Sequence, residues 1–135
     1  MKKKVGKVDI SALNVPPEKH EYETAKYFAN RGFDVTFIKP HYINGYHNPD
    51  FAMAGKIWET KSPQNGKERT FESSLRKAIK QSEHIIIDFR RSKPSEEKLY
   101  MSKILKQKGI PSIKTLLVIT RDGNLLTIKG KFDIM

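Results

Sequence analysis

The sequence predicts a single α/β domain in which helices alternate with the strands of one sheet. Residues 18–30 and 68–83 carry apolar side chains at helical spacing, as packed helices do. Residues 84–89 form a β-branched run without alternation, which is typical of a central parallel strand buried on both faces. Gly-containing turns at 54–56 and 121–124 separate strand-like segments, and a length of 135 residues suits one domain.

The composition indicates an anionic partner. The net charge is +11, which favours nucleic acid over an acidic protein or a membrane surface. The chain has no Cys, so disulfides and thiolate metal sites are excluded. No apolar run approaches the roughly 20 residues of a membrane-spanning helix, and the basic residues after Met1 precede no apolar stretch of a secretory signal.

The first elements are a basic segment and a helix. Residues 1–17 end in two prolines and are predicted to be a loosely attached arm or linker, with the domain proper over 18–135. In the helix over 18–30, which Gly32 ends, Glu21 falls on the apolar side and Glu23 points away. A carboxylate on a buried stripe costs free energy unless it is paired or binds a metal, so Glu21 is a candidate ligand. The expected apolar stripe comprises Tyr22, Ala25, Phe28 and Ala29.

A strand over 33–39 and a polar, aromatic loop over 41–47 lead to a hairpin over 48–61. Alternation places Glu59 and Lys61 on one face of its second strand. With a two-residue turn, paired positions sum to 109 or 111, and Asp50 lies opposite one of these two residues. Two carboxylates and an ammonium therefore converge, a set that can hold a magnesium-like ion and position a water.

The remaining segments complete the alternation. The helix over 68–83 is expected to bury an apolar stripe and to expose a basic ridge that contacts phosphates. A central strand over 84–89, a helix over 94–108 and a hairpin over 114–129 follow. The residues predicted to contact nucleic acid are Arg76, Lys77, Lys80 and Gln81 on this helix, and His47 in the loop before the acidic hairpin.

The acidic hairpin resembles the active-site motif of the PD-(D/E)xK nuclease superfamily. Pro49-Asp50 corresponds to the first half of the motif, and Glu59-Thr60-Lys61 to the second. The predicted order also agrees with the restriction-endonuclease-like αβββαβ core of that superfamily, here with an extra helix and a C-terminal β-hairpin. The resemblance implies a third acid on the first helix, for which Glu21 is the first candidate and Glu23 the reserve.

Longer phrases resemble a narrower family, the C-terminal tRNA nuclease domain of contact-dependent growth inhibition toxins of the CdiA type. The resemblance covers about residues 18–121 and rests on phrases at 21–25, 31–35, 48–50, 58–63, 75–83 and 85–88. It implies metal-dependent cleavage of nucleic acid, tRNA ahead of DNA, and a cognate immunity protein. It also implies action in the bacterial cytoplasm after delivery as the tip of a secreted toxin. The chain is then an excised domain, a free-standing relative or a domesticated one.

The predicted chemistry is phosphodiester hydrolysis by a metal-dependent endonuclease. Asp50 and Glu59 ligate Mg²⁺ or Mn²⁺, with Zn²⁺ as a further candidate, and the backbone carbonyl of Thr60 and the side chain of Glu21 complete the shell. Lys61 orients the water and stabilises developing negative charge.

Three alternatives stay open at this point. The domain could bind nucleic acid without cleaving it, or act as a metal-free ribonuclease with His41 or His47 as general base. It could also be a structural domain of a phage or mobile element that keeps only the fold.

Overall fold

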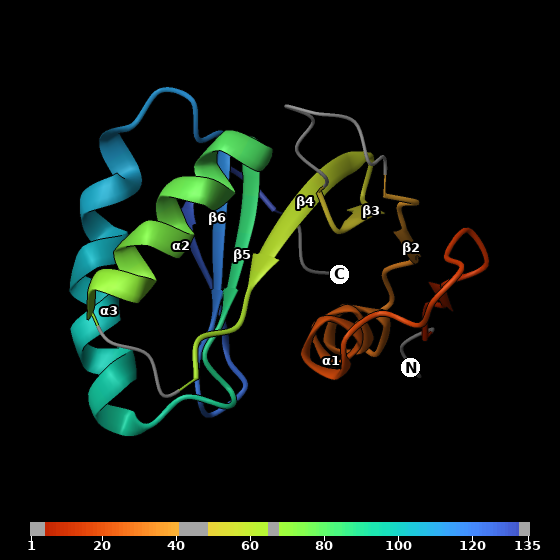
Figure 1. The fold of residues 1–135 in the computed structure, drawn as a ribbon, viewed down its shortest axis with the longest axis horizontal. Coiled ribbons are helices and arrows are strands. Elements are labelled where there is room, and N and C mark those ends of the chain that lie inside the picture. Colours follow the sequence, from red (N-terminus) through yellow and green to blue (C-terminus); the bar gives the residue numbers. More distant parts are fainter. Residues whose placement is uncertain (1–4, 41–48, 65–67, 133–135) are drawn as a thin grey trace.

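The computed structural model describes residues 5–40, 49–64 and 68–132. Among these residues, seven strands form one mixed sheet, with helices packed on both of its faces (Figure 1). Helix α1 (Lys19–Ala29) covers one face, and α2 (Glu68–Gln81) and α3 (Pro94–Lys106) cover the other. The architecture is therefore the mixed α/β fold that the alternation of patterns predicts.

The strands lie in the sheet in their sequence order. They are β1 (Val8–Asp9), β2 (Val35–Phe37), β3 (Phe51–Met53), β4 (Lys56–Lys61), β5 (His84–Asp88), β6 (Thr115–Ile119) and β7 (Leu125–Lys129). Strands β4, β5 and β6 run parallel, because α2 and α3 connect them, whereas β2–β3–β4 and β6–β7 are antiparallel. A 3-10 turn, η1 (Gln107–Gly109), ends α3. From α1 to β5 the elements follow the predicted order, and the predicted C-terminal hairpin is β6–β7.

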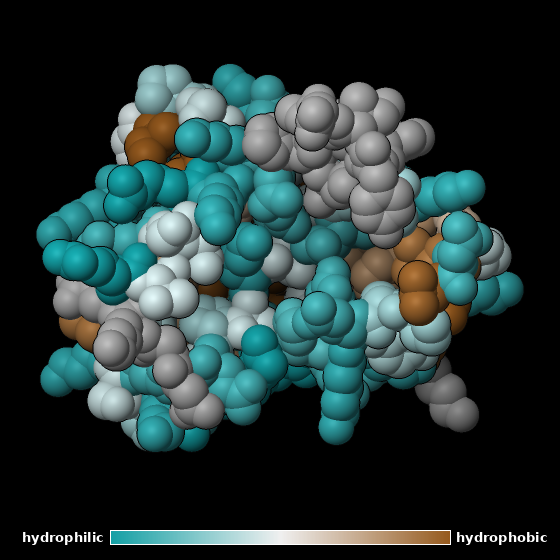
Figure 2. Space-filling view, in the orientation of Figure 1, coloured by the Kyte–Doolittle hydropathy of each residue, from teal (hydrophilic) through white to brown (hydrophobic). Residues whose placement is uncertain are grey.

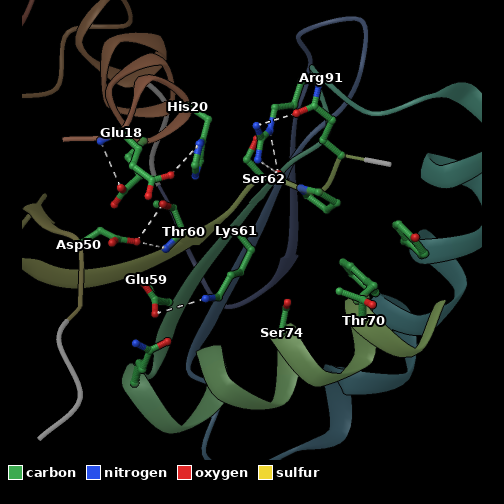
Figure 3. Close-up of a pocket in the computed structure, with 16 residues that line it drawn as sticks. Glu18, His20, Asp50, Glu59, Thr60, Lys61, Ser62, Thr70, Ser74 and Arg91 are labelled. Atoms are coloured by element: carbon green, nitrogen blue, oxygen red, sulfur yellow. Dashed lines mark hydrogen bonds and ion pairs between the residues drawn. The ribbon is translucent and has the colours of Figure 1, made fainter. Parts of the chain in front are cut away.

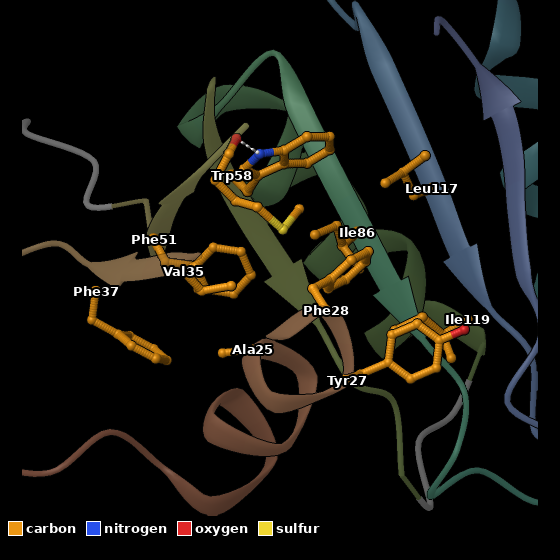
Figure 4. Close-up of a cluster of buried hydrophobic side chains, with 11 residues drawn as sticks. Ala25, Tyr27, Phe28, Val35, Phe37, Phe51, Trp58, Ile86, Leu117 and Ile119 are labelled. Carbon is orange, nitrogen blue, oxygen red and sulfur yellow. Dashed lines mark hydrogen bonds between the residues drawn. The ribbon is translucent and has the colours of Figure 1, made fainter. Parts of the chain in front are cut away.

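The core is split by the sheet into two layers. On the α1 side, Phe28 packs with Phe51, Trp58 and Ile86, and the Trp58 indole N–H donates to the carbonyl of Met53 at 2.9 Å (Figure 4). On the α2–α3 side the core comprises Phe71, Leu75, Tyr100, Ile85, Ile87 and their neighbours. Alternate residues of β5 enter the two layers, so the prediction of a strand buried on both faces is confirmed.

Helix α1 is rotated slightly from its predicted orientation. Ala25, Phe28 and Ala29 are buried as expected, and Tyr27 is buried with them. The prediction that Tyr22 is buried is wrong, because its side chain is exposed. The hydroxyl of Tyr27 instead donates to the carbonyl of Gly123 at 2.7 Å. The turn between β6 and β7 therefore fixes which face of α1 packs inward.

Part of the segment predicted as an arm belongs to the sheet. Strand β1 pairs in parallel with β2, with Val8 opposite Val35. The amide of Gly6 donates to Ala29 at 2.7 Å, and the amide of Lys7 donates to the Asp34 carboxylate at 2.9 Å. An edge strand of two residues is too short to leave an alternating pattern in the sequence.

The β3–β4 hairpin sets the register of the predicted site. Its two turn residues, Ala54 and Gly55, both have positive φ (53° and 74°), as in the primed turns that suit hairpins. Phe51 pairs with Trp58, so paired positions in the ladder sum to 109, and Asp50 directly precedes the last pair. The register is thus one of the two that the sequence allows.

Hydrophilic residues cover most of the face shown in Figure 2, and the surface is hollowed between α1 and the α2–α3 pair. Within the described ranges, no helix has the length and apolar character needed to cross a membrane.

Candidate active site

A cavity of about 410 Å³ opens beyond the carboxyl end of β4, between α1 and α2. Figure 3 shows Glu59 and Lys61 pointing from β4 toward α2, with Asp50 and Thr60 beside them. The cavity collects side chains from four parts of the chain. Its lining includes Glu18, His20 and Glu21 from α1 and its cap, Asp50, Glu59, Thr60, Lys61, Ser62 and Gln64 from the hairpin and the loop after it, Thr70, Ser74 and Gln81 from α2, and Arg91.

Asp50 is held in place by the backbone of the hairpin. Its amide donates to the carbonyl of Trp58 at 2.9 Å, at the end of the β3–β4 ladder. One carboxylate oxygen, Oδ2, accepts hydrogen bonds from the amide and hydroxyl of Thr60, at 2.7 and 2.9 Å. The Asp50 carboxylate is therefore held by Thr60, and it also forms side-chain hydrogen bonds with Glu21 and Glu59.

Glu59 is an acid inside the protein, with only 2% of its surface exposed. Trp58 faces the α1 layer of the core, so strand alternation turns Glu59 and Lys61 to the α2 face. The Lys61 ammonium lies 3.9 Å from Oε2 of Glu59, a loose ion pair between a half-buried cation and a buried acid. Lys61 is thus close enough to act on the same bound group as Glu59.

Glu21 reaches the cavity from the first turn of α1. Its Oε1 accepts a hydrogen bond from the amide of Glu18 at 3.3 Å, which ties the side chain to the helix N-terminus. Glu23 is exposed and does not line this cavity. Of the two acids that the sequence left open, Glu21 is the one that meets Asp50.

Asp50 perturbs both glutamates strongly. Burial, reinforced by a hydrogen bond and repulsion from Asp50, raises the pKa of Glu21 to about 8. The same causes raise the pKa of Glu59 to about 9, against an opposing effect of Lys61. Asp50 is the neighbour that the two glutamates share. Without a cation the site therefore favours protons on the glutamates, and a cation is the other means of offsetting their charge.

Two further features fit a divalent ion. Glu18, His20 and Glu21 offer ligand atoms that all lie within 4.8 Å of one another, so Glu21 links these donors to Asp50. Among the described residues, Oε1 of Gln81 is buried and meets no hydrogen-bond donor, although it lies in the wall of the same cavity. Oxygen donors of this kind suit Mg²⁺ or Mn²⁺, and the neighbouring imidazole also suits Zn²⁺.

Sequence reasoning missed two residues of the cavity, His20 and Arg91. Burial and the positive charge of Arg91 lower the pKa of His20, whose Nδ1 lies 3.5 Å from Glu18. Arg91 donates two hydrogen bonds to the carbonyl of Ser62, at 2.6 and 2.8 Å, and so closes the loop after β4 over the cavity. The position of His20 beside Glu21 in a first helical turn is a usable sequence signal, whereas Arg91 gives none.

The residues predicted to contact nucleic acid are divided by the structure. Gln81 lines the cavity, and Lys77 and Lys80 are exposed on α2. Arg76 lies in a separate hollow toward α3, together with Glu72 and Lys103. His47 falls outside the described residues.

The C-terminal domain of the contact-dependent growth inhibition protein CdiA is a family whose sequence profile matches residues 47–125, more than half of the chain. The chain belongs to this family. Membership in the CdiA C-terminal family makes it a toxin domain. The matched range contains Asp50, Glu59, Lys61 and Arg91, and it begins after α1.

The fold agrees with this assignment. A chain from the CdiA-CT/CdiI toxin and immunity complex from Burkholderia pseudomallei superposes with a TM-score of 0.63 at 22% identity. The alignment covers 92% of this chain and 99% of that chain, so the likeness extends over nearly all of the fold. A search of curated proteins gave no match.

Proposed function

We propose that this CdiA C-terminal domain is a metal-dependent endonuclease of the PD-(D/E)xK type that hydrolyses nucleic acid, with tRNA favoured over DNA. The observation that carries the proposal is the meeting of Glu21, Asp50 and Glu59 with Lys61 in one cavity. The two glutamates have raised pKa values there, as expected for buried acids whose role is to bind a cation. The net charge of +11 supports a polyanionic substrate.

Asp50, Glu59, Glu21 and the carbonyl of Thr60 would hold Mg²⁺ or Mn²⁺, and Zn²⁺ is a further candidate. When bound, such an ion polarises a phosphoryl oxygen and lowers the pKa of a water. Thr60 keeps the Asp50 carboxylate oriented through two donated hydrogen bonds.

Lys61 has the role of the fixed cation. Its ammonium is held beside Glu59 and half-shielded from solvent, so it can stabilise negative charge that develops on the phosphoryl oxygens. It can also orient the attacking water by donating a hydrogen bond. The cations on the exposed side of α2, Lys77 and Lys80, are positioned to bind flanking phosphates.

The biological setting follows from the same proposal. The Burkholderia pseudomallei relative is a toxin in complex with an immunity protein. We infer that a cognate immunity protein also blocks this domain. Its site of action is then the cytoplasm of a target bacterium, reached as the tip of a secreted toxin.

The test is cleavage of total tRNA and of plasmid DNA by the purified protein, with Mg²⁺, Mn²⁺, Zn²⁺ or EDTA. Cleavage should require an ion and should fall by about 10²-fold or more in Asp50→Asn and Lys61→Ala, which lose a ligand and the charge stabiliser. Sequencing the new ends identifies the substrate, and a uniform break in one class of tRNA is expected. Cleavage that persists in EDTA would indicate a metal-free ribonuclease, and binding without cleavage would indicate a binding module.

A further inference from the structure

A second cavity, of about 450 Å³, adjoins the candidate active site. The two cavities share His20, Ser62, Gln64 and Arg91, so they form two compartments of one depression. The second compartment lies between the first turn of α1 and the segment after β5. Its remaining lining residues are Lys19, Glu23, Asp88 and Arg90.

The compartments differ in charge. The first is lined by four carboxylates and two cations, whereas the second is lined by three cations and two carboxylates. Asp88 and Arg90 form an ion pair, which leaves Lys19 and Arg91 against Glu23. The first compartment thus suits a metal ion and the second suits an anion.

Arg90 is fixed by a buried network. Asp88, only 3% exposed, accepts hydrogen bonds from Nε and Nη2 of Arg90, at 3.1 and 2.8 Å, and from the Thr24 hydroxyl at 2.7 Å. The same Nη2 donates to the carbonyl of Glu23 at 2.9 Å. A guanidinium held from several sides is preorganised and needs little ordering when an anion binds.

Arg91 stands at the boundary between the compartments. It donates to the carbonyl of Ser62 and, at 2.9 Å, to the side chain of Gln64. Its charge therefore faces both cavities from a defined position. Lys19, exposed in the first turn of α1, approaches the second compartment from the opposite side.

We propose that this second compartment binds the phosphate next to the one that is cleaved, with Lys19 and Arg91 as its contacts and Arg90 as fixed electrostatic support. The inference rests on the proposed nuclease function. A strand with one phosphate in the acidic compartment must place its neighbour one nucleotide away, and the basic compartment is the adjoining depression. The site would recognise phosphate and sugar rather than base identity.

The experiment compares Lys19→Gln with Lys26→Gln, a control that removes the same charge from an exposed lysine of α1 that lines neither cavity. Both are made in the Lys61→Ala protein, in which cleavage is expected to be slower by about 10²-fold or more. Fluorescence anisotropy with a short labelled RNA strand, and with the same sequence as DNA, gives affinity as a function of salt in the presence of Mg²⁺. Lys19→Gln should weaken binding and reduce the slope of log K against log[salt] by about 0.7, the value for one single-strand phosphate contact.

The controls separate the two proposals. The slope of Lys26→Gln should equal that of the parent protein. Two results would show that the second compartment is not a phosphate site while leaving the nuclease proposal in place. In the first, the parent binds and Lys19→Gln keeps the parent slope. In the second, Lys19→Gln and Lys26→Gln lose equal affinity and equal slope. If the parent binds neither RNA nor DNA, the proposed phosphate site is overturned. Cleavage by the wild-type protein decides the nuclease proposal independently.

Discussion

Glu59 is the residue at which stability and function conflict most clearly. It is almost completely buried beside Asp50, and its nearest cation, Lys61, lies at the loose distance of 3.9 Å. Burying a carboxylate with so little compensation costs free energy. Such an arrangement is expected where binding of a cation, rather than folding, is the role of the acid.

Substitution of Glu59 by Gln should therefore separate activity from stability. Cleavage should fall by about 10²-fold or more, because a ligand and a negative charge are lost. In EDTA at pH 8 the thermal midpoint should stay equal or rise, because the amide keeps the shape and removes the repulsion from Asp50. Glu83→Gln, which changes an exposed acid that lines neither cavity, should change neither quantity. A large drop in the midpoint of Glu59→Gln would mean that the acid supports the fold instead.

Much of the hairpin part of the site was predictable from the sequence. For the register of the hairpin, the sequence predicted two alternatives. Strand alternation places Glu59 and Lys61 on one face, but the turn leaves two registers, and only the structure shows the one in which Phe51 pairs with Trp58. Helical periodicity separates Glu21 from Glu23. It does not bring His20 and Arg91 together, because that contact depends on how α1 meets a segment about 70 residues away.

Among the elements, the β3–β4 hairpin carries the site, and its turn is not optimal. Ala54 and Gly55 both have positive φ, and only Gly adopts that region at no cost. Replacing Ala54 by Asn, which favours this turn before Gly, should stabilise the protein by about 0.5–1 kcal/mol in urea unfolding. Gly55→Ala should destabilise it by a similar amount although a Cβ there meets nothing within 4 Å, since the cost is that of the backbone alone. A stabilised Gly55→Ala would contradict this account of the turn.

Helix α2 presents two different faces, although one basic ridge was predicted from the sequence. Thr70, Ser74 and Gln81 line the active-site cavity, and Lys77 shares their stripe at helical spacing, whereas Arg76 lies about 100° away on the side of α3.

This division predicts different effects of two neutralising substitutions on α2. Lys77→Gln should weaken nucleic-acid binding and lower the salt slope by about 0.7, as loss of one phosphate contact does. Arg76→Gln should have a smaller effect, because Arg76 faces Glu72 and Lys103 in a separate hollow. Anisotropy titrations at several salt concentrations measure both, and equal losses would mean that the ridge acts as a diffuse field.

Whether a segment forms a helix or a strand was the most predictable feature of the fold. Which strands pair with one another was the least predictable. The helix and strand patterns gave α1, α2, β5 and the C-terminal hairpin nearly at their observed bounds. Strand β1 was not foreseen, because two residues carry no period and their pairing with Val35 and Thr36 is formed across an intervening helix.

At the scale of the whole molecule, the site lies where two halves of the sheet meet. In Figure 1, strand β4 crosses between β2–β3 and β5–β6. Helix α1 packs on one face of the sheet, and α2 and α3 pack on the other face, against β5 and β6. The acids therefore come from both sides of the junction, Glu21 from the α1 side and Glu59 toward the α2 side. A cation bound between them would couple the two halves and so contribute to global stability.

That coupling predicts how pH and metal ions change the stability of the protein. The pKa values of Glu21 and Glu59 are raised in the folded protein to about 8 and about 9, above the ordinary value of 4.5. Their protonated forms therefore stabilise the fold fully below pH 4.5, and this stabilisation is lost as pH rises through 8 to 9. In EDTA, the thermal midpoint should fall as pH rises from 4.5 to about 9.

Mg²⁺ or Mn²⁺ should reverse the fall, since a cation replaces the protons. At a concentration of one hundred times Kd it should add about 2.7 kcal/mol, and at a fixed ion concentration the gain should be larger at higher pH. Glu59→Gln serves as the control, because it should flatten the pH profile in EDTA and reduce the gain from either ion. Calorimetry at constant ionic strength measures all of these quantities. A flat wild-type profile in EDTA, or an equal gain from Mg²⁺ in Glu59→Gln, would show that the carboxylates of this cavity do not form the metal site.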